Sequence, residues 1–420
     1  MSSTTSPPNG APDGPLEGPL DGPPDGPLAG LRVIDAATIL AGPQIASLLG
    51  DFGADVIKVE HPKGDPLRHT GIKKDGHGLW WKVVARNKRC VTAKLSDPDG
   101  KALFLRLIET ADVLIENFRP GTLERWGLGW EDLKSINPRL VMVRVTGFGQ
   151  TGPYKDRPGF GTLAEAFSGF SHITGEADGP PTLPPFGLAD GVAAQYGTFA
   201  TMFALYERDA KGSGAGQMID LSIYEPLFAL VGYQPTMFDQ TGIVQNRTGN
   251  RSVNNAPRNT YKTSDGRWVA LSSASPSILR RLLELTGGPG TADDPRFETA
   301  ESRLAHVDAL DAIVGGWIAR HDLATVTAEF ERVEAAIAPV MDVGQIFEDP
   351  QYIARGDVVS IEDADLGPVR MQSVFPRLSR TPGQIRHTGQ NLGQHNDEIF
   401  GEEFGLSPED LKRLKAQGAI

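Results

Sequence analysis

The sequence is poor in cysteine: Cys90 is the single one in 420 residues. An intramolecular disulfide framework is therefore excluded, and the composition is typical of a protein of the reducing cytoplasm, where we expect this chain to work. No apolar run approaches the roughly 18 residues that a membrane-spanning helix requires. The chain also lacks an excess of basic residues. Its net charge of −12 argues against binding to nucleic acid, although an acidic protein can still carry a local basic pocket for a small anion.

Most of the short motifs that indicate an enzyme class are also missing. There is no GxGxxG after the first predicted strand, and there is no P-loop, GxSxG, HExxH or CxxC pattern. The glycine-rich stretch 212–216 lies between a predicted helix and a predicted strand, so we expect a plain turn there. The eight histidines show no metal-ligand spacing. We therefore predict no metal centre and no permanently bound cofactor.

Composition divides the chain into four stretches. Residues 1–30 are dense in proline and glycine, which predicts a disordered tail. In residues 31–225, short β-branched runs alternate with helical stretches, a pattern that predicts βαβ units and a parallel α/β sheet. Residues 226–339 contain a hairpin signal in NTYKTSDGRWVALSS and amphipathic helices, typical of a smaller α+β domain. Residues 340–420 return to compact α/β-like segments and end in a helix capped by Ser407.

Asp190 is the acidic residue in the most informative position. It stands where a Pro/Gly-rich stretch, PPFGLADG, turns into a long predicted helix over about 191–208. One interpretation makes it the helix N-cap, because aspartate oxygens accept the free N–H groups of a first turn. A functional interpretation is compatible with this one: the helix dipole would hold the carboxylate ionised, and Gly187 and Gly191 would let a bulky substrate approach. The residues alone leave both interpretations open.

Several ordered blocks of the sequence resemble one known family. They are LAGP at Leu40–Pro43, GADVIKVEHPKGDPLR, NKR at Asn87–Arg89, ADVLIENFRPGTLERWGLG, GFGQTGPY, ITGEADGPPTLPPFGLADG, GAGQMIDLSIYE and GQHNDEIFGEEFGLS. From Leu31 to the C-terminus, about 390 residues, the chain is similar to family III CoA-transferases. That group contains formyl-CoA:oxalate and carnitine CoA-transferases and, as relatives, α-methylacyl-CoA racemases. Many blocks in the same order are far more specific than any single motif.

The resemblance implies a fold, an activity and an assembly. The implied fold is α/β, with a Rossmann-like large domain whose parallel sheet is formed by both ends of the chain, and a smaller α+β domain. The implied activity is CoA transfer from an acyl-CoA thioester to a carboxylic acid, through a mixed anhydride and an aspartyl-CoA thioester on Asp190. The implied assembly is an interlocked homodimer. The expected partners are small acyl-CoA and carboxylic acid molecules, with no nucleic acid and no membrane.

The resemblance also implies a set of residues that bind coenzyme A. These six residues are Leu40, Ala41, His61, Asn117, Phe118 and Arg125. The chemistry is consistent, since CoA phosphates need cationic or N–H donors and the adenine needs an apolar or aromatic wall. His61 stands where some relatives carry arginine. Without the resemblance, core packing explains Phe118 and a solvated helix charge explains Arg125.

A racemase is the main alternative on the same fold, and an inactive CoA-binding relative is the non-enzymatic one. Racemisation needs two proton shuttles, one on each face of the α-carbon. The resemblance places the racemase histidine on Phe160 and a supporting glutamate on Lys262, and neither residue suits that role; His172 is a nearby substitute in the sequence. A transferase needs only the carboxylate of Asp190. We therefore expect a transferase, and the sequence leaves its acyl groups open.

Overall fold

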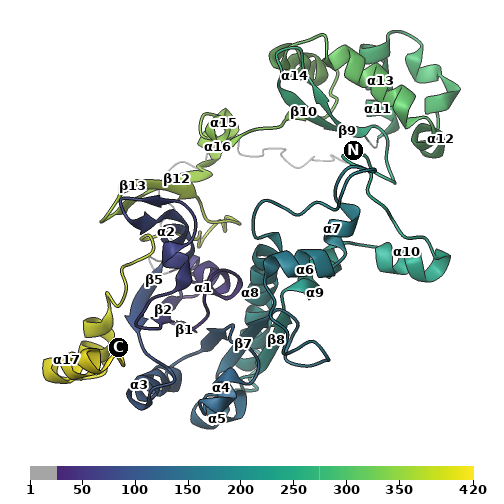
Figure 1. Cartoon of the computed structure of the whole chain (residues 1–420). Coiled ribbons are helices and arrows are strands. Elements are labelled where there is room, and N and C mark those ends of the chain that lie inside the picture. The colour runs from purple at the N-terminus through teal and green to yellow at the C-terminus, as the bar shows by residue number, and fades with distance from the viewer. Residues whose placement is uncertain (1–25, 274) are drawn as a thin grey trace, which may run out of the picture.

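A six-stranded parallel sheet forms the centre of the computed structural model, which describes residues 26–273 and 275–420 (Figure 1). The strands lie in the order β5-β2-β1-β6-β7-β8, and neighbours pair in parallel. Their bounds are β1 Arg32–Asp35, β2 Asp55–Glu60, β5 Lys88–Thr92, β6 Val113–Glu116, β7 Val141–Thr146 and β8 Met218–Ser222. The predicted parallel α/β sheet is confirmed.

Alternate side chains of these strands enter two separate apolar cores. Val33 of β1 and Val113 of β6 pack in one core, whereas their neighbours Ile34 and Leu114 pack in the other. Successive side chains of a strand point to opposite faces, so a strand that is apolar at every position must be covered on both sides. This explains why adjacent residues of a strand are both apolar, such as Val33 and Ile34 in β1 and Val113 and Leu114 in β6.

Helices provide that cover on both faces. α1 (Ala41–Asp51) and α8 (Leu188–Asp209) pack on each other and on one face of the sheet. α3 (Pro98–Glu109) and α5 (Trp130–Ile136) contribute to the core on the other face. α8 has 22 residues. No helix in the described ranges combines the length and the apolar character that crossing a membrane demands.

The strand order produces a crevice at one edge of the sheet. From β1 the chain adds β2 and β5 on one side, and then β6, β7 and β8 on the other. This is the order of Rossmann-type sheets, in which the loops that follow the two central strands run in opposite directions. In doubly wound sheets, ligands bind at this point, outside the carboxyl ends of the strands. The functional site is therefore expected beside the ends of β1 and β6.

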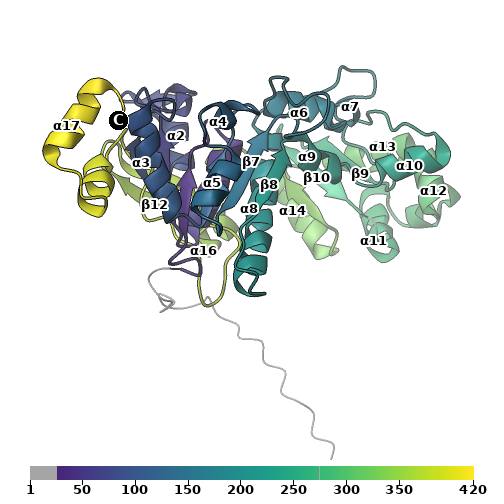
Figure 2. The same cartoon turned by 90° about the horizontal axis from the view of Figure 1, so that it is seen from below.

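The prediction that both ends of the chain form the parallel sheet is wrong. All six of its strands lie between residues 32 and 222. The C-terminal stretch forms a separate antiparallel hairpin of β12 (Val358–Asp363) and β13 (Gly367–Gln372), then a π-helix (Asp397–Glu403) and α17 (Pro408–Gln417). Figure 2 shows α17 beside α3, and both belong to the same apolar core. The C-terminus thus returns to the large domain through helix packing.

Two side chains and one backbone N–H of the C-terminal stretch, and not a further strand, complete the edge of the sheet at β5. The N–H of Cys90 donates to His395 Nδ1 at 2.9 Å, and the carbonyl of Cys90 accepts from the backbone N–H of His395 at 2.9 Å. The N–H of Thr92 donates to Asn396 Oδ1 at 2.9 Å. These bonds occupy backbone groups that an edge strand would otherwise expose. They give the block GQHNDE a structural role and explain why the C-terminal stretch adds no strand there.

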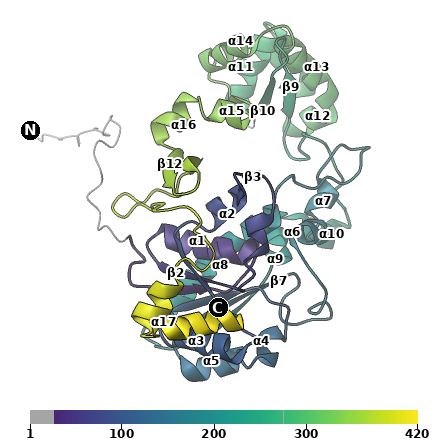
Figure 3. The ribbon, with the colours of Figure 1, turned by 60° about the vertical axis from the view of Figure 1, so that its left-hand side comes forward.

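The smaller α+β unit folds around its own core. β9 (Arg258–Lys262) and β10 (Trp268–Ser272) form the hairpin that the DG turn predicted, and β11 (Ile337–Pro339) pairs with β10. The helices packed on this sheet are α11 Pro276–Gly287, α12 Ala300–Ala305, α13 Val307–Ile318 and α14 Leu323–Arg332. Figure 3 shows α15 and α16 leading from this unit back towards β12.

Short elements complete the described chain. They are η1 Pro66–His69, β3 Lys73–Lys74, β4 His77–Gly78, α2 Leu79–Val84, α4 Thr122–Arg125, α6 Gly161–Phe167, α7 Phe170–Ile173, α9 Tyr224–Leu230, α10 Gln234–Thr241, η2 Thr291–Asp293, η3 Pro295–Phe297, α15 Val343–Ile346 and α16 Pro350–Arg355. The glycine-rich stretch 212–216 contains no helix or strand, as expected. Ser407 caps α17 as predicted, since its Oγ accepts from the N–H of Asp410 at 3.1 Å.

Residues 26–30, which we assigned to the disordered tail, form a turn attached to the large domain. The N–H of Leu28 donates to the carbonyl of Phe52 at 2.9 Å, and Leu28 packs on the core beneath α1. An apolar side chain that finds a core overrides the proline and glycine around it. The predicted boundary at residue 30 is therefore too late. Residues 1–25 lie outside the described residues.

Candidate active site

A cavity of about 610 Å³ opens at the carboxyl edge of the sheet, beside β1 and β6. This volume suits a small-molecule ligand. Its walls come from the connections after three strands and from the first turns of α1, α6 and α8. The lining residues are 38–41 after β1, 117–120 after β6, 145–147 at the end of β7, Lys155 and 157–162 further along the same connection, and 184–187 with Asp190 at α8; Trp80 and Ile223 complete them.

Asp190 lies in the first turn of α8 and faces this cavity. The helix begins at Leu188 with Gly187 as its N-cap, so Asp190 is the third helical residue. The interpretation of Asp190 as the N-cap is therefore wrong. The chain enters the helix earlier than the Pro/Gly-rich stretch suggested, because glycine also serves as an N-cap. Within residues 26–273 and 275–420, the carboxylate of Asp190 accepts no hydrogen bond.

The electrostatic surroundings of Asp190 favour its protonated form. Burial, followed by repulsion from the Glu165 carboxylate, raises the pKa of Asp190 from 3.8 to about 6. Glu165 is buried in α6, and its Oε1 accepts from the N–H of Ala189 at 3.3 Å. We expected the helix dipole to stabilise the ionised form and so to lower the pKa of Asp190; the pKa is raised instead. The sequence analysis missed Glu165. Its carboxylate accepts the hydrogen bond of the Ala189 N–H at the start of α8, and its negative charge disfavours ionisation of Asp190.

Two glycines lie so close to Asp190 that a side chain on either would approach its carboxylate. A Cβ on Gly161 would overlap Asp190 Oδ2 and lie 2.9 Å from its Cγ. A Cβ on Gly187 would lie 3.2 Å from Asp190 Oδ2 and 2.6 Å from Leu40 Cδ2. Gly191, which we expected to admit a substrate, faces open space. Glycine at 161 therefore leaves room for the carboxylate in its observed position, and glycine at 187 leaves room mainly for Leu40. Gly161 is a second residue that the sequence analysis missed.

The structure brings together four of the six residues predicted to bind CoA. Leu40, Ala41, Asn117 and Phe118 line the cavity with Asp190. Their contacts with CoA remain predictions.

The other two residues lie outside the cavity lining. Arg125 ends the short helix α4 and donates from Nη2 to Thr122 Oγ1 at 3.0 Å. His61 lies exposed in the loop after β2, where its Nδ1 accepts from the N–H of Lys63 at 3.1 Å. Any contact of Arg125 or His61 with CoA must therefore lie beyond this cavity.

Three basic residues of the cavity were not anticipated. They are Arg119, Lys155 and Arg157. None forms a salt bridge with another residue that the structure describes, and the guanidinium of Arg157 lies 3.6 Å from the centroid of the Tyr154 ring. Arg119 directly follows Phe118 in the ENFR segment, and this adjacency was the signal available in the sequence. These cations make the cavity a local anion-binding region in an acidic protein.

The residues at the racemase positions are not arranged as a second proton shuttle. Phe160 lines the cavity and is the N-cap of α6. Lys262 lies on β9 of the smaller unit, and His172 lies on α7; neither lines the cavity. In the described part of the chain, no histidine lines it. Asp190 is its only carboxylate among those residues.

Comparison with known proteins identifies the family. The family model of CoA-transferase family III matches residues 28–396. The succinyl-CoA–D-citramalate CoA-transferase of Chloroflexus aurantiacus is 43% identical over 395 residues, which cover 94% of this chain and 98% of that protein. The β subunit of the succinyl-CoA–L-malate CoA-transferase of the same organism is 42% identical over 398 residues, which cover 94% of this chain and 98% of that protein.

A solved structure agrees with this result. The crystal structure of a CAIB/BAIF family protein from Brucella suis matches with a TM-score of 0.81 and 33% identity, covering 90% of this chain and 99% of that one. The chain therefore belongs to CoA-transferase family III and is a CoA-transferase.

Proposed function

We propose that Asp190 is the covalent relay of this CoA-transferase. The observation that carries the proposal is the state of its carboxylate, which faces the cavity, has no hydrogen-bond partner among the described residues and has a pKa of about 6. A carboxylate without partners is free to attack an acyl carbon. Its raised pKa makes the ionised form more nucleophilic than an ordinary aspartate, and at neutral pH most of it is ionised.

The reaction follows from two exchanges on this one group. Asp190 attacks the donor thioester, which breaks the C–S bond and gives a mixed anhydride and CoA thiolate. The thiolate then attacks the aspartyl carbonyl, which releases the donor acid and leaves an aspartyl-CoA thioester. The acceptor carboxylate attacks this thioester, which expels CoA thiolate and forms a second mixed anhydride. The thiolate then attacks the acyl carbon derived from the acceptor, which gives the product acyl-CoA and restores the Asp190 carboxylate. Each step replaces one activated acyl bond by another, so positioning and exclusion of water are the main requirements.

The substrates we propose are dicarboxylic. The two Chloroflexus relatives are named for succinyl-CoA as donor and for citramalate or malate as acceptor. Lys155 and Arg157 line the same cavity as Asp190 without salt-bridge partners in the described residues. A second carboxylate on the acyl group would meet these cations, while a monocarboxylic acid would leave them unpaired. We therefore propose succinyl-CoA as donor and a dicarboxylic acid as acceptor.

The racemase alternative is tested by proton exchange. Phe160 cannot move a proton, so we expect no solvent deuterium at the α-position of 2-methylacyl-CoA. Incorporation at a rate comparable with CoA transfer would establish a racemase in place of the transferase mechanism.

We also propose a homodimer. Large apolar side chains are exposed on α8, α9 and α10, and Phe203 is 67% exposed. The other exposed large apolar side chains are Phe199 and Tyr206 on α8, Phe228 and Leu230 on α9, Phe238 on α10, and Tyr233 just before α10. α8 packs on α9, and monomeric proteins rarely expose this much large apolar surface, so a second copy is the expected cover. The interlocked form stays a prediction from the family. A monomeric mass by light scattering at micromolar concentration would contradict the dimer.

Asp190→Asn is the experiment that tests the relay. Asparagine keeps the size but cannot form the anhydride, so transfer from succinyl-CoA should fall by more than about 1,000-fold while the protein still binds CoA. Hydroxylamine added with succinyl-CoA should convert the activated carboxyl of Asp190 to a hydroxamate in the wild type alone. Asp156→Asn is the matched control, because Asp156 is exposed and does not line the cavity. Near-normal turnover of Asp190→Asn would refute the proposal.

A further inference from the structure

The cavity wall next to β1 contains a residue in a strained backbone conformation. Ile39 has φ of 68°, in the left-handed region. A β-branched residue is a true outlier there, because its Cβ crowds the carbonyl oxygen that follows. Ile39 lines the cavity between Thr38 and Leu40. A conformation of this kind persists only where the surroundings over-determine it, and such sites cluster at ligand-binding positions.

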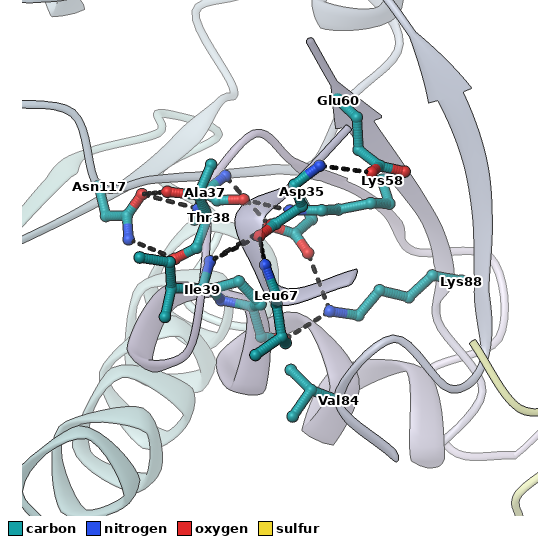
Figure 4. A network of polar contacts seen from close by, with 12 residues as sticks. Asp35, Ala37, Thr38, Ile39, Lys58, Glu60, Leu67, Val84, Lys88 and Asn117 are labelled. Atoms are coloured by element: carbon teal, nitrogen blue, oxygen red, sulfur yellow. Dashed lines mark hydrogen bonds and ion pairs between the residues drawn. The ribbon is translucent and has the colours of Figure 1, made fainter. Parts of the chain in front are cut away.

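Buried charged side chains hold the backbone on both sides of this point (Figure 4). The N–H of Ala37 donates to Asp35 Oδ1 at 3.1 Å, and its carbonyl accepts from Lys58 Nζ. The N–H of Ile39 itself donates to the carboxylate of Asp65, at 3.2 Å to Oδ1 and 3.3 Å to Oδ2. The N–H direction of Ile39 is thus set by a carboxylate that lies in a different loop, after β2.

The side-chain amide of Asn117 holds Thr38, the residue between Ala37 and Ile39. Its Oδ1 accepts from the N–H of Thr38 at 2.8 Å, and its Nδ2 donates to the carbonyl of Thr38 at 2.8 Å. Both functional groups of the amide are therefore used by the backbone of one residue. We predicted that Asn117 binds CoA; in the structure its amide is engaged with the cavity wall, as Figure 4 shows.

The anchors are themselves fixed to the rigid sheet. Lys58 of β2 is 1% exposed and lies 3.1 Å from Asp65 Oδ2 and 3.7 Å from Asp35 Oδ1. Lys88 of β5 donates to Asp35 Oδ2 at 2.9 Å and to the carbonyl of Pro43, in α1, at 2.6 Å. Burying four charges is expensive, and apolar residues of similar size often give a fold of equal stability. The role that best explains this network is therefore to fix the backbone of residues 37–39, and not to increase the free energy of unfolding.

We propose that Asp65 and Asn117 are positioning residues that hold Ile39 in its left-handed conformation and so pre-form the cavity wall 38–41 for the acyl-CoA substrate. The inference rests on the proposed use of this cavity as the acyl-CoA site. Neither residue needs to react. Loss of an anchor lets Ile39 relax to negative φ, which displaces Leu40 and Ala41 at the start of α1 and lowers the fraction of protein that is competent to bind.

Asp65 is the residue to test, because it does not line the cavity. Asp65→Ala should raise the KM for succinyl-CoA by about 10-fold or more, with kcat at saturation within about threefold. If Asp65→Ala does not fold, Asp65→Asn keeps the size and the acceptor oxygen while it removes the charge facing Lys58. The readout is then the same, with a smaller rise in KM.

Ile39→Gly separates positioning from a merely structural role. Glycine adopts positive φ without strain, so the left-handed conformation no longer depends on the anchor. We expect the rise in KM caused by Asp65→Ala to be at least about 5-fold smaller in the Ile39→Gly background. Asp363→Ala is the matched control, since Asp363 is also a buried carboxylate paired with a buried lysine, Lys82 at 2.8 Å, away from the cavity lining. Its effect should be the same in both backgrounds.

The outcomes discriminate clearly. Equal effects of Asp65→Ala in the wild-type and Ile39→Gly backgrounds would overturn the inference, and so would a loss of kcat without a rise in KM. Hydroxamate formation on Asp190 at saturating succinyl-CoA is measured in parallel. If the wild type forms none, the proposed relay fails; if wild type and Asp65→Ala both form it, the KM comparison judges the positioning role alone.

Discussion

Asp190→Asn should make the folded protein more stable at neutral pH, while it abolishes transfer. The change keeps the size of the side chain and removes the charge of a half-buried carboxylate that has no hydrogen-bond partner in the described residues. Most substitutions destabilise a protein. The opposite sign is expected here because the fold holds an ionised carboxylate where burial and Glu165 make its charge less favourable than in the unfolded chain.

The magnitude follows from the pKa of Asp190, which burial and then Glu165 raise from 3.8 to about 6. The folded chain binds this proton more tightly than the unfolded chain, so ionisation of Asp190 destabilises the fold. The penalty is absent below pH about 4, grows between about 4 and 6, and is complete above about 6. At about 1.4 kcal/mol per pKa unit, a rise of roughly two units gives at most about 3 kcal/mol. Solvent screening of a half-buried group lowers the expected gain to about 1–3 kcal/mol.

Urea unfolding measures this gain. Wild type and Asp190→Asn are compared at one protomer concentration, at a pH of about 8 and again at a pH of about 4. The variant should be more stable at the higher pH and equal to the wild type at the lower one. Asp156→Asn, an exposed site, should change stability at neither pH. A variant that is less stable than the wild type at a pH of about 8 would show that the Asp190 carboxylate has stabilising partners, and the reasoning would be refuted.

Three further predictions concern the surroundings of Asp190. Gly161→Ala should lower kcat by about 100-fold or more with folding retained, because the new Cβ overlaps Asp190 Oδ2; equal kcat would show that the carboxylate can move aside. Glu165→Gln should shift the acidic limb of the kcat/KM profile to lower pH, because it removes a charge that raises the pKa of Asp190; an unchanged limb would contradict this. Arg157→Gln should raise the KM for dicarboxylic acceptors by about 10-fold, with acetate as the acceptor that shows no change; an equal rise for acetate would contradict the pairing with a second carboxylate.

The parallel sheet was predictable because its signal is local. The central strands send adjacent apolar side chains into the cores on both faces, and these short apolar stretches alternate in the sequence with the helices that cover the sheet. The cap at Ser407 and the hairpin over β9 and β10 depend on residues within a few positions of one another, and both were found. The prediction that the C-terminal stretch adds a strand to the sheet was wrong for a non-local reason. The side chains of His395 and Asn396 bind backbone N–H groups of β5 that a further strand would have used, and these residues lie 305 and 304 positions from their partners.

The candidate site was predictable only where the resemblance reached it. Asp190, Leu40, Ala41, Asn117 and Phe118 do meet in one cavity, as blocks far apart in the sequence suggested. The sequence analysis had no means of finding the contact of Gly161 with Asp190, because it depends on how α6 meets α8. The same holds for Glu165, which lies 24 positions before the amide it accepts from.

Two aspartates of this region show why residue type alone does not assign a role. Burial would raise the pKa of Asp65, but Lys58 and the N–H groups of Leu67 and Ile39 lower it below its ordinary value. Asp190 has burial and Glu165, and no cation or N–H to oppose them among the described residues, so its pKa is raised. A carboxylate whose oxygens are all occupied is held as an anion and can position a backbone, as we infer for Asp65. A carboxylate whose oxygens are free and whose negative charge is disfavoured, such as that of Asp190, is stabilised when it forms a covalent bond with an acyl carbon and loses that charge. The same side chain thus serves as anchor or as nucleophile according to the donors that the fold places around it.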